Sequence, residues 1–216
     1  MTTQEKNVIT CLIQLHEQNK QEEIYNVVDE YLNKEQPSEE LLVWLAIFFD
    51  QPPMVYYPKS IELVEQALKM NPNNPYAIIV LAYIYYYDLG EIPEEVFKRL
   101  ESIHNENPEI QSMIEYVKSW YLKDKDHEKY VETLKVSISL CDKYVDNFID
   151  LGRYYRENNK EEKGISLIKM GVANIQRVYP GSDETKDLFD NFFDQNIKGT
   201  YVTKWRYDDY AAIVKS

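Results

Sequence analysis

The amino-acid sequence predicts an all-α protein in which antiparallel helix pairs stack into a solenoid. Trp44, Ala67 and Pro72 stand at positions 4, 27 and 32 of a helix–turn–helix repeat of 34 residues. The chain has only six Gly and nine Pro, against 19 Tyr. Most of the Gly and Pro residues fall between apolar segments, which favours helices joined by short turns. Because one such repeat buries its apolar face only against a neighbour, we expect about four to five stacked repeats and a C-terminal capping helix.

The N-terminal residues 1–36 are predicted to form a helical hairpin. Val8, Leu12 and Leu15 follow helical spacing, and a second apolar series begins after a short polar turn. A Gln-Pro pair ends the hairpin, and Ser38 is placed to cap the next helix. The hairpin is a candidate for a diverged further repeat.

The clearest repeat begins with a helix that runs from Trp44 to about Asp50. A Pro-Pro pair stops this helix, and residues 59–70 supply its partner with one consistent apolar face. Asn71-Pro72 closes the unit. Both helices of a pair are therefore present, with breakers where the turns should fall.

Two later segments repeat the pattern. Leu81-Ala82-x-x-Tyr85 and Leu151-Gly152-x-x-Tyr155 each place a small residue where the two helices of a pair approach closely. A unit over residues 111–140 is more degenerate but keeps its helical periodicity. The helix that follows Gly152 carries Gly164 and Gly171, and glycine inside a helix costs roughly 1 kcal/mol relative to alanine. Close packing of that helix would explain why these glycines are tolerated.

These segments resemble the tetratricopeptide repeat family, whose signature is W-x₂-L-G-x₂-Y, then A-x₃-F, then a late Pro. The resemblance covers roughly residues 41–175, although Ile47, Phe48 and Gln51 stand where the family prefers Leu, Gly and Tyr. It implies a right-handed α-solenoid in which the first helix of each pair lines a concave surface. Residues 37–178 are accordingly predicted to be the repeats.

Residues 179–216 are predicted to hold the capping helix and a C-terminal tail. Ser182 can cap a helix that ends near Asn196. Its apolar and acidic faces are formed, respectively, by Leu188, Phe192 and Phe193, and by Asp187, Asp190 and Asp194. For the tail beyond Gly199 the sequence allows two conformations: a coil packed by Tyr201 and Trp205, or a short final helix.

The register of the resemblance assigns candidate partner-binding residues on the concave face. From the N-terminal to the C-terminal end they are Leu42, Leu45, Phe49, Tyr76, Tyr83, Tyr86, Tyr87, Glu115, Arg153 and Arg156. Tyrosines supply a large contact area with few rotatable bonds, so the run around Tyr83 is the sharpest candidate. The sequence does not decide whether Tyr83 and Tyr86 face the groove or the core. Leu45 and Phe49 occupy positions where some family members hold a peptide carboxylate with Lys and Asn, which disfavours that mode.

The composition opposes several classes of function. A formal net charge of −13 disfavours nucleic-acid binding, because phosphate contacts need clustered Lys and Arg. An acidic surface favours a basic partner or simply solubility. The N-terminus lacks the features of a signal peptide, and the longest apolar run, residues 76–87, is far shorter than the roughly 20 residues of a bilayer span. We therefore expect a cytoplasmic protein that contacts no membrane.

No motif for catalysis, cofactor binding or metal binding is apparent. His16, His104 and His127 have no His or Cys at helical spacing, and Cys11 and Cys141 are isolated. Neither a P-loop, nor a G-x-S-x-G turn, nor a GxGxxG loop occurs. We expect no catalytic residue, no cofactor and no metal, and hence no enzyme.

The leading hypothesis is a protein–protein interaction module that binds a peptide or a folded protein on its concave face. A more specific form is an immunity or antitoxin protein for a basic toxin, motivated by the acidic charge and a loose resemblance to bacterial repeat-containing immunity proteins. The alternative is a structural or scaffold subunit that self-associates through its aromatic surface. The sequence leaves open whether the chain is a monomer or a homodimer.

Overall fold

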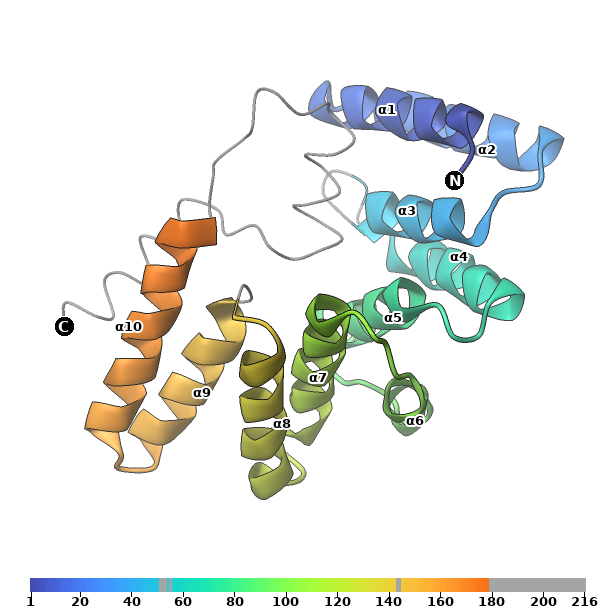
Figure 1. Cartoon of the computed structure of the whole chain (residues 1–216). Coiled ribbons are helices and arrows are strands. Elements are labelled where there is room, and N and C mark those ends of the chain that lie inside the picture. The colour runs from blue at the N-terminus through green and yellow to red at the C-terminus, as the bar shows by residue number, and fades with distance from the viewer. Residues whose placement is uncertain (51–53, 55, 143–144, 179–216) are drawn as a thin grey trace. The chain divides into compact units, whose positions relative to one another are not determined.

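The computed structural model describes residues 1–50, 54, 56–142 and 145–178, and this part of the chain is built of helices without strands (Figure 1). The helices are α1 Thr3–Glu17, α2 Gln21–Lys34, α3 Glu39–Asp50, α4 Tyr57–Met70, α5 Pro75–Tyr87, α6 Glu94–Ser102, α7 Pro108–Leu122, α8 His127–Leu140, α9 Val145–Glu157 and α10 Glu161–Val178. The predicted all-α class is confirmed. The capping helix and the tail predicted for residues 179–216 lie outside the described residues.

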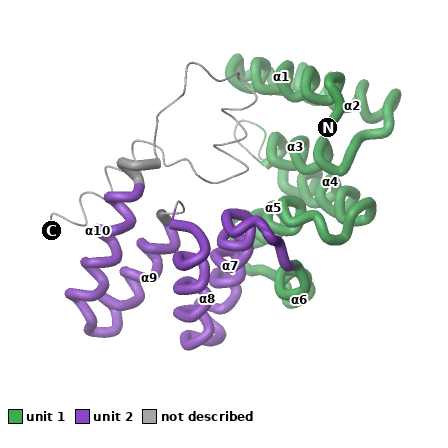
Figure 2. The backbone as a smooth tube through the Cα atoms, viewed as in Figure 1, with its two compact units in different colours: residues 1–103, 186–192 green, residues 104–185, 193–216 purple. Residues whose placement is uncertain are grey.

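The described helices form two compact units (Figure 2). Of the described residues, those up to Ile103, with α1 to α6, belong to unit 1, and those from His104 on, with α7 to α10, belong to unit 2. This division falls inside the block of repeats predicted for residues 37–178.

The N-terminal hairpin is formed by α1 and α2, as predicted, but its buried face differs from the prediction. Ile9, Leu12 and Ile13 are buried, whereas Val8 and Leu15 are only half-buried. Both sets follow helical spacing, so periodicity alone permits either face. The packing of α1 against the rest of unit 1 selects the Ile9 face.

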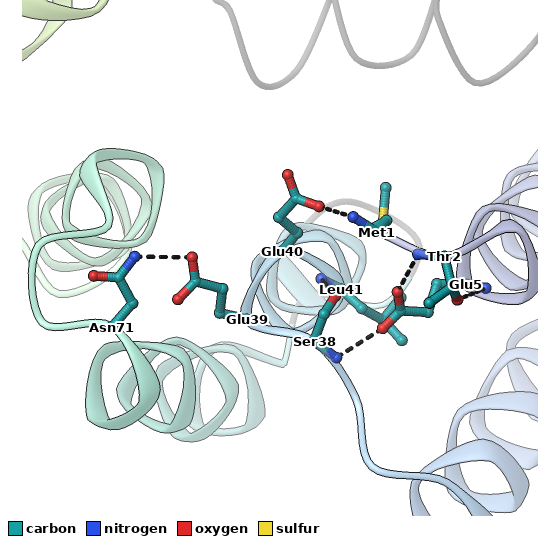
Figure 3. Close-up of polar contacts among 8 residues, drawn as sticks. All are labelled: Met1, Thr2, Glu5, Ser38, Glu39, Glu40, Leu41 and Asn71. Atoms are coloured by element: carbon teal, nitrogen blue, oxygen red, sulfur yellow. Dashed lines mark hydrogen bonds and ion pairs between the residues drawn. The ribbon is translucent and has the colours of Figure 1, made fainter.

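A buried carboxylate ties the start of α1 to the start of α3 (Figure 3). The backbone N–H of Thr2 donates to one Glu5 oxygen at 2.6 Å, and the N–H of Ser38 donates to the other at 2.7 Å. Burial acts to raise the pKa of Glu5, but these hydrogen bonds outweigh it and hold the pKa below its ordinary value. Ser38 in turn accepts from the N–H of Leu41 at 3.2 Å, which confirms Ser38 as the cap of α3.

The hydrophobic core of unit 1 is centred on α3. Every residue from Leu41 to Phe49 is buried, so this helix is covered on all sides. Part of the cover comes from the N-terminal hairpin, because the ring of His16 lies edge-on to Phe48 at 6.1 Å and the ring of Tyr25 contacts Phe49 at 5.2 Å. The hairpin is therefore part of the folded core of unit 1.

In unit 2 the helices α9 and α10 approach each other closely at two glycines. A Cβ atom on Gly164 would lie 2.5 Å from the Gly152 carbonyl oxygen, and one on Gly152 would lie 2.9 Å from the Gly164 carbonyl oxygen. Such distances leave no space for a methyl group. The close packing expected at Gly152 and Gly164 is thus present.

A buried polar cluster links α7, α8 and α9. The Ser112 hydroxyl donates to the Ser137 carbonyl at 2.7 Å, the Ser137 hydroxyl donates back to the Ser112 carbonyl at 2.8 Å, and the Asn147 amide donates to Ser137 Oγ at 3.0 Å. All three residues are fully buried. These hydrogen bonds tie the three helices together, although Asn147 Oδ1 is buried without a hydrogen-bond partner among the described residues.

Candidate interaction surface

The N-terminal part of the predicted concave surface is closed. Leu42, Leu45 and Phe49 are each only 1% exposed, so the expectation that they line an open surface is wrong. They share α3 with residues that face other helices, and the whole helix is buried. In this structure these side chains form core packing and are not presented to a partner.

The tyrosine run of α5 is accessible in part. Tyr83 is 38% exposed and Tyr87 is 52% exposed, whereas Tyr76 and Tyr86 are half-buried. The rings of Tyr83 and Tyr87 lie 4.5 Å apart, and the ring of Tyr86 packs edge-on against Tyr87 at 5.0 Å. For Tyr83 the choice between core and surface is therefore decided in favour of the surface.

Two further exposed tyrosines stand at the start of α4, where sequence reasoning did not select them. Tyr56 is 48% exposed and Tyr57 is 39% exposed, and the backbone N–H of Tyr56 donates to the carbonyl of Phe49 at the end of α3. We use the name tyrosine surface for the four exposed side chains of Tyr56, Tyr57, Tyr83 and Tyr87. The signal in the sequence was the Tyr-Tyr pair that follows the Pro-Pro turn, a position favourable for exposure.

Two carboxyl groups meet beside this surface, at the ends of α3 and α5. Asp50 is the last residue of α3, Asp88 is the C-cap of α5, and their side chains are in hydrogen-bonding contact. Burial, together with the hydrogen bond and the charge of Asp88, raises the pKa of Asp50 to about 7. One oxygen of Asp50 is shielded from solvent and has no hydrogen-bond partner among the described residues. The two carboxyls thus share a site that favours a proton.

The predicted contact residues of unit 2 are charged and engaged with neighbours. Glu115 is half-buried and pairs with Lys118 at 3.0 Å, and Arg156 pairs with Glu161 at 2.8 Å. Arg153 is exposed and borders a shallow depression together with Arg156 and Glu161. These residues belong to unit 2, whereas the tyrosine surface belongs to unit 1.

The acidic charge is concentrated in the first half of the chain. Residues 1–103 contain 17 Asp and Glu against 7 Lys and Arg, whereas residues 104–178 contain 13 against 12. Unit 1 therefore carries most of the excess negative charge, and it also carries the five most exposed tyrosines of the described residues. These are Tyr25, Tyr56, Tyr57, Tyr83 and Tyr87.

Neither a cluster of metal ligands nor a membrane-spanning helix is found in the described part of the chain. Among the described residues no group of three or more His, Cys, Asp or Glu side chains is arranged to hold a metal ion. None of the helices in that part is both long enough and apolar enough to cross a bilayer.

No protein-family model and no curated protein matches the chain. Three solved structures share its fold at 15% sequence identity. "MamA RS-1 ArsTM double mutant" and "MamA 41-end from Desulfovibrio magneticus RS-1" each match with a TM-score of 0.59 over 82% of this chain, covering 97% and 98% of the neighbour. "MamA MSR-1 C2" matches with a TM-score of 0.52 over 82% of this chain and 99% of the neighbour. The chain therefore has the tetratricopeptide-like, all-helical solenoid fold of these MamA structures, as the sequence predicted.

Proposed function

We propose that the protein is a non-enzymatic protein–protein interaction module that contacts its partner through the tyrosine surface of unit 1. The observation that supports this is the exposure of Tyr83 and Tyr87, whose tilted rings contact each other at 4.5 Å at the end of α5. A ring pair of this kind is held in place before binding, so little rotamer entropy is lost when a partner covers it.

The tyrosine surface is a better candidate than the apolar end of the predicted groove. A side chain that is 1% exposed, such as Leu42 or Leu45, offers no area to a partner unless the core opens. Exposed tyrosines offer an apolar face and a hydroxyl together, which is why tyrosine is enriched at the centres of interfaces.

The proposal is tested by capturing partners from the native host with the intact chain and with the double variant Tyr83→Ala/Tyr87→Ala. We expect at least one co-purifying protein to be lost with the variant, because each interfacial tyrosine contributes about 1–3 kcal/mol when truncated. Met170→Ala is the matched control, since Met170 is as exposed as Tyr87, at 52%, but lies on α10 of unit 2. Equal recovery of every partner by the wild type and the tyrosine variant would refute the assignment.

Self-association is a second candidate for the same surface. Four exposed tyrosines could be buried against a second copy of the chain, as in a symmetric dimer. Light scattering over a dilution series distinguishes the two cases. A dimer that resists dilution and is dissociated by Tyr83→Ala/Tyr87→Ala would assign the surface to the oligomer, whereas a monomer at all concentrations leaves it to another protein.

An immunity or antitoxin role is one specific form of an interaction module. The acidic charge of unit 1 supports a basic partner. No feature of the described residues selects a toxin over another protein of that charge.

A further inference from the structure

We propose that the tyrosine surface binds a basic polypeptide segment of the partner, and that an arginine of this segment lies between the tyrosine rings and the carboxyls of Asp50 and Asp88. This inference rests on the proposed function and specifies the chemistry of the partner.

The ends of α3 and α5 bring the aromatic and acidic groups together. Helix α3 packs against α5, with Asp50 as the last residue of α3 and Asp88 as the C-cap of α5, and the two carboxyls are close enough to influence each other's ionisation. Tyr87 directly precedes Asp88 in the chain. The backbone N–H of Tyr56 donates a hydrogen bond to the carbonyl of Phe49, the residue before Asp50. Two exposed tyrosines therefore lie within one residue of the carboxyl pair, along the chain at Tyr87 and across a backbone hydrogen bond at Tyr56.

Each of these helix ends adds further negative potential. The C-terminal end of a helix carries a partial negative charge, which a Lys, Arg or His in the last turn ordinarily compensates. The last turns of α3 and α5 contain no basic residue, whereas those of α2 and α4 contain Lys34 and Lys69. The place beside Asp50 and Asp88 thus combines two carboxyls with two helix ends that lack a compensating cation of their own.

An arginine side chain fits these groups better than other ligands. Its guanidinium stacks on aromatic faces and donates in a fork to carboxylates, whereas a lysine offers only a compact charge. Nucleic acids and anionic membranes are repelled by the 17 acidic against 7 basic residues of unit 1. A neutral apolar segment could use the rings but would leave the carboxyls buried without a cation.

The test uses the full chain and a defined probe, acetylated hexa-arginine amide, titrated by calorimetry at low and at high salt. We expect binding that weakens with salt, and Asp88→Asn should weaken it about tenfold through loss of one charge-assisted hydrogen bond. Tyr87→Ala should weaken it several-fold through loss of the stacked ring. Circular dichroism checks that both variants keep their helices.

Glu22→Gln is the matched control, because it removes one exposed negative charge from α2 of the same unit. A site at Asp88 predicts that Glu22→Gln changes the affinity less than about twofold. Equal weakening by both variants would show that only the total charge matters and would overturn the inference, as would no binding of hexa-arginine at all. If hexa-arginine fails to bind while Tyr83→Ala/Tyr87→Ala still loses a captured partner, this inference falls and the proposed function stands.

Discussion

Replacing Asp50 by asparagine should stabilise the protein above neutral pH and leave its stability in acid almost unchanged. Burial first, and then the neighbouring Asp88, raises the pKa of Asp50 from 3.8 to about 7 in the folded chain. Between these two values the unfolded chain has already lost the proton that the folded chain retains. The contribution of Asp50 to stability is therefore fully present below about pH 4 and is lost as the pH rises through about 7.

The size of the effect follows from the shift. A rise from 3.8 to about 7 corresponds to an upper bound of about 4 kcal/mol, at 1.36 kcal/mol for each pKa unit. Because Asp50 is only partly shielded from solvent, screening should reduce this to about 1–2 kcal/mol. Asparagine has nearly the same shape and no charge, so Asp50→Asn should recover that amount above neutral pH.

Urea unfolding followed by circular dichroism measures the difference in free energy of unfolding between Asp50→Asn and the wild type. The difference should be near zero at about pH 4 and grow to its full value by about pH 8. Asp88→Asn should give a smaller gain, since it removes the repulsion but leaves Asp50 buried. A difference that does not change with pH, or a larger gain from Asp88→Asn, would refute the reasoning.

Three further substitutions test the packing of the two units. Glu5→Gln should lower the free energy of unfolding by about 1–3 kcal/mol at neutral pH, and the loss should disappear as the pH falls through the lowered pKa of Glu5, which urea titration at several pH values would show. Gly164→Ala should cost about 1–3 kcal/mol because the added methyl group would lie 2.5 Å from the Gly152 carbonyl oxygen, and thermal unfolding would detect the lower Tm. Ser137→Ala should cost a similar amount because the Asn147 amide would lose its partner in a buried site, and amide hydrogen exchange in α8 and α9 should become faster. No change of stability in any one of these variants would contradict the packing described for its site.

Much of the fold could be predicted because its determinants are local. The Leu151-Gly152-x-x-Tyr155 pattern placed a small residue where α9 crosses α10, and the structure has the close approach at that position. Ser38 was predicted as a cap from its place before an acidic first turn, and its hydroxyl accepts from Leu41. Caps, breakers and helical periodicity act over a few residues, so the sequence carries them directly.

The candidate site was predictable only in part. Tyr83 was assigned to the concave face by register, but α5 is apolar around its whole circumference, so periodicity could not decide whether the side chain is covered. For the same reason the register placed Leu42 and Leu45 on an open surface, whereas the structure buries them. The sequence carries no signal that sets Asp50 apart, since an acidic residue at a helix end is common on solvated surfaces.

The sequence by itself determined that this protein is a series of helix pairs, that Ser38 caps one of the helices, and that its charge is acidic. Only the tertiary structure decided which faces remain accessible and which charges meet. Burial of α3 depends on rings such as those of His16 and Tyr25 that another hairpin brings to it. The pKa of Asp50 depends on a carboxyl from another helix. Exposure and pKa are set by neighbours that are distant in the sequence, and these neighbours are defined only once the helices have packed.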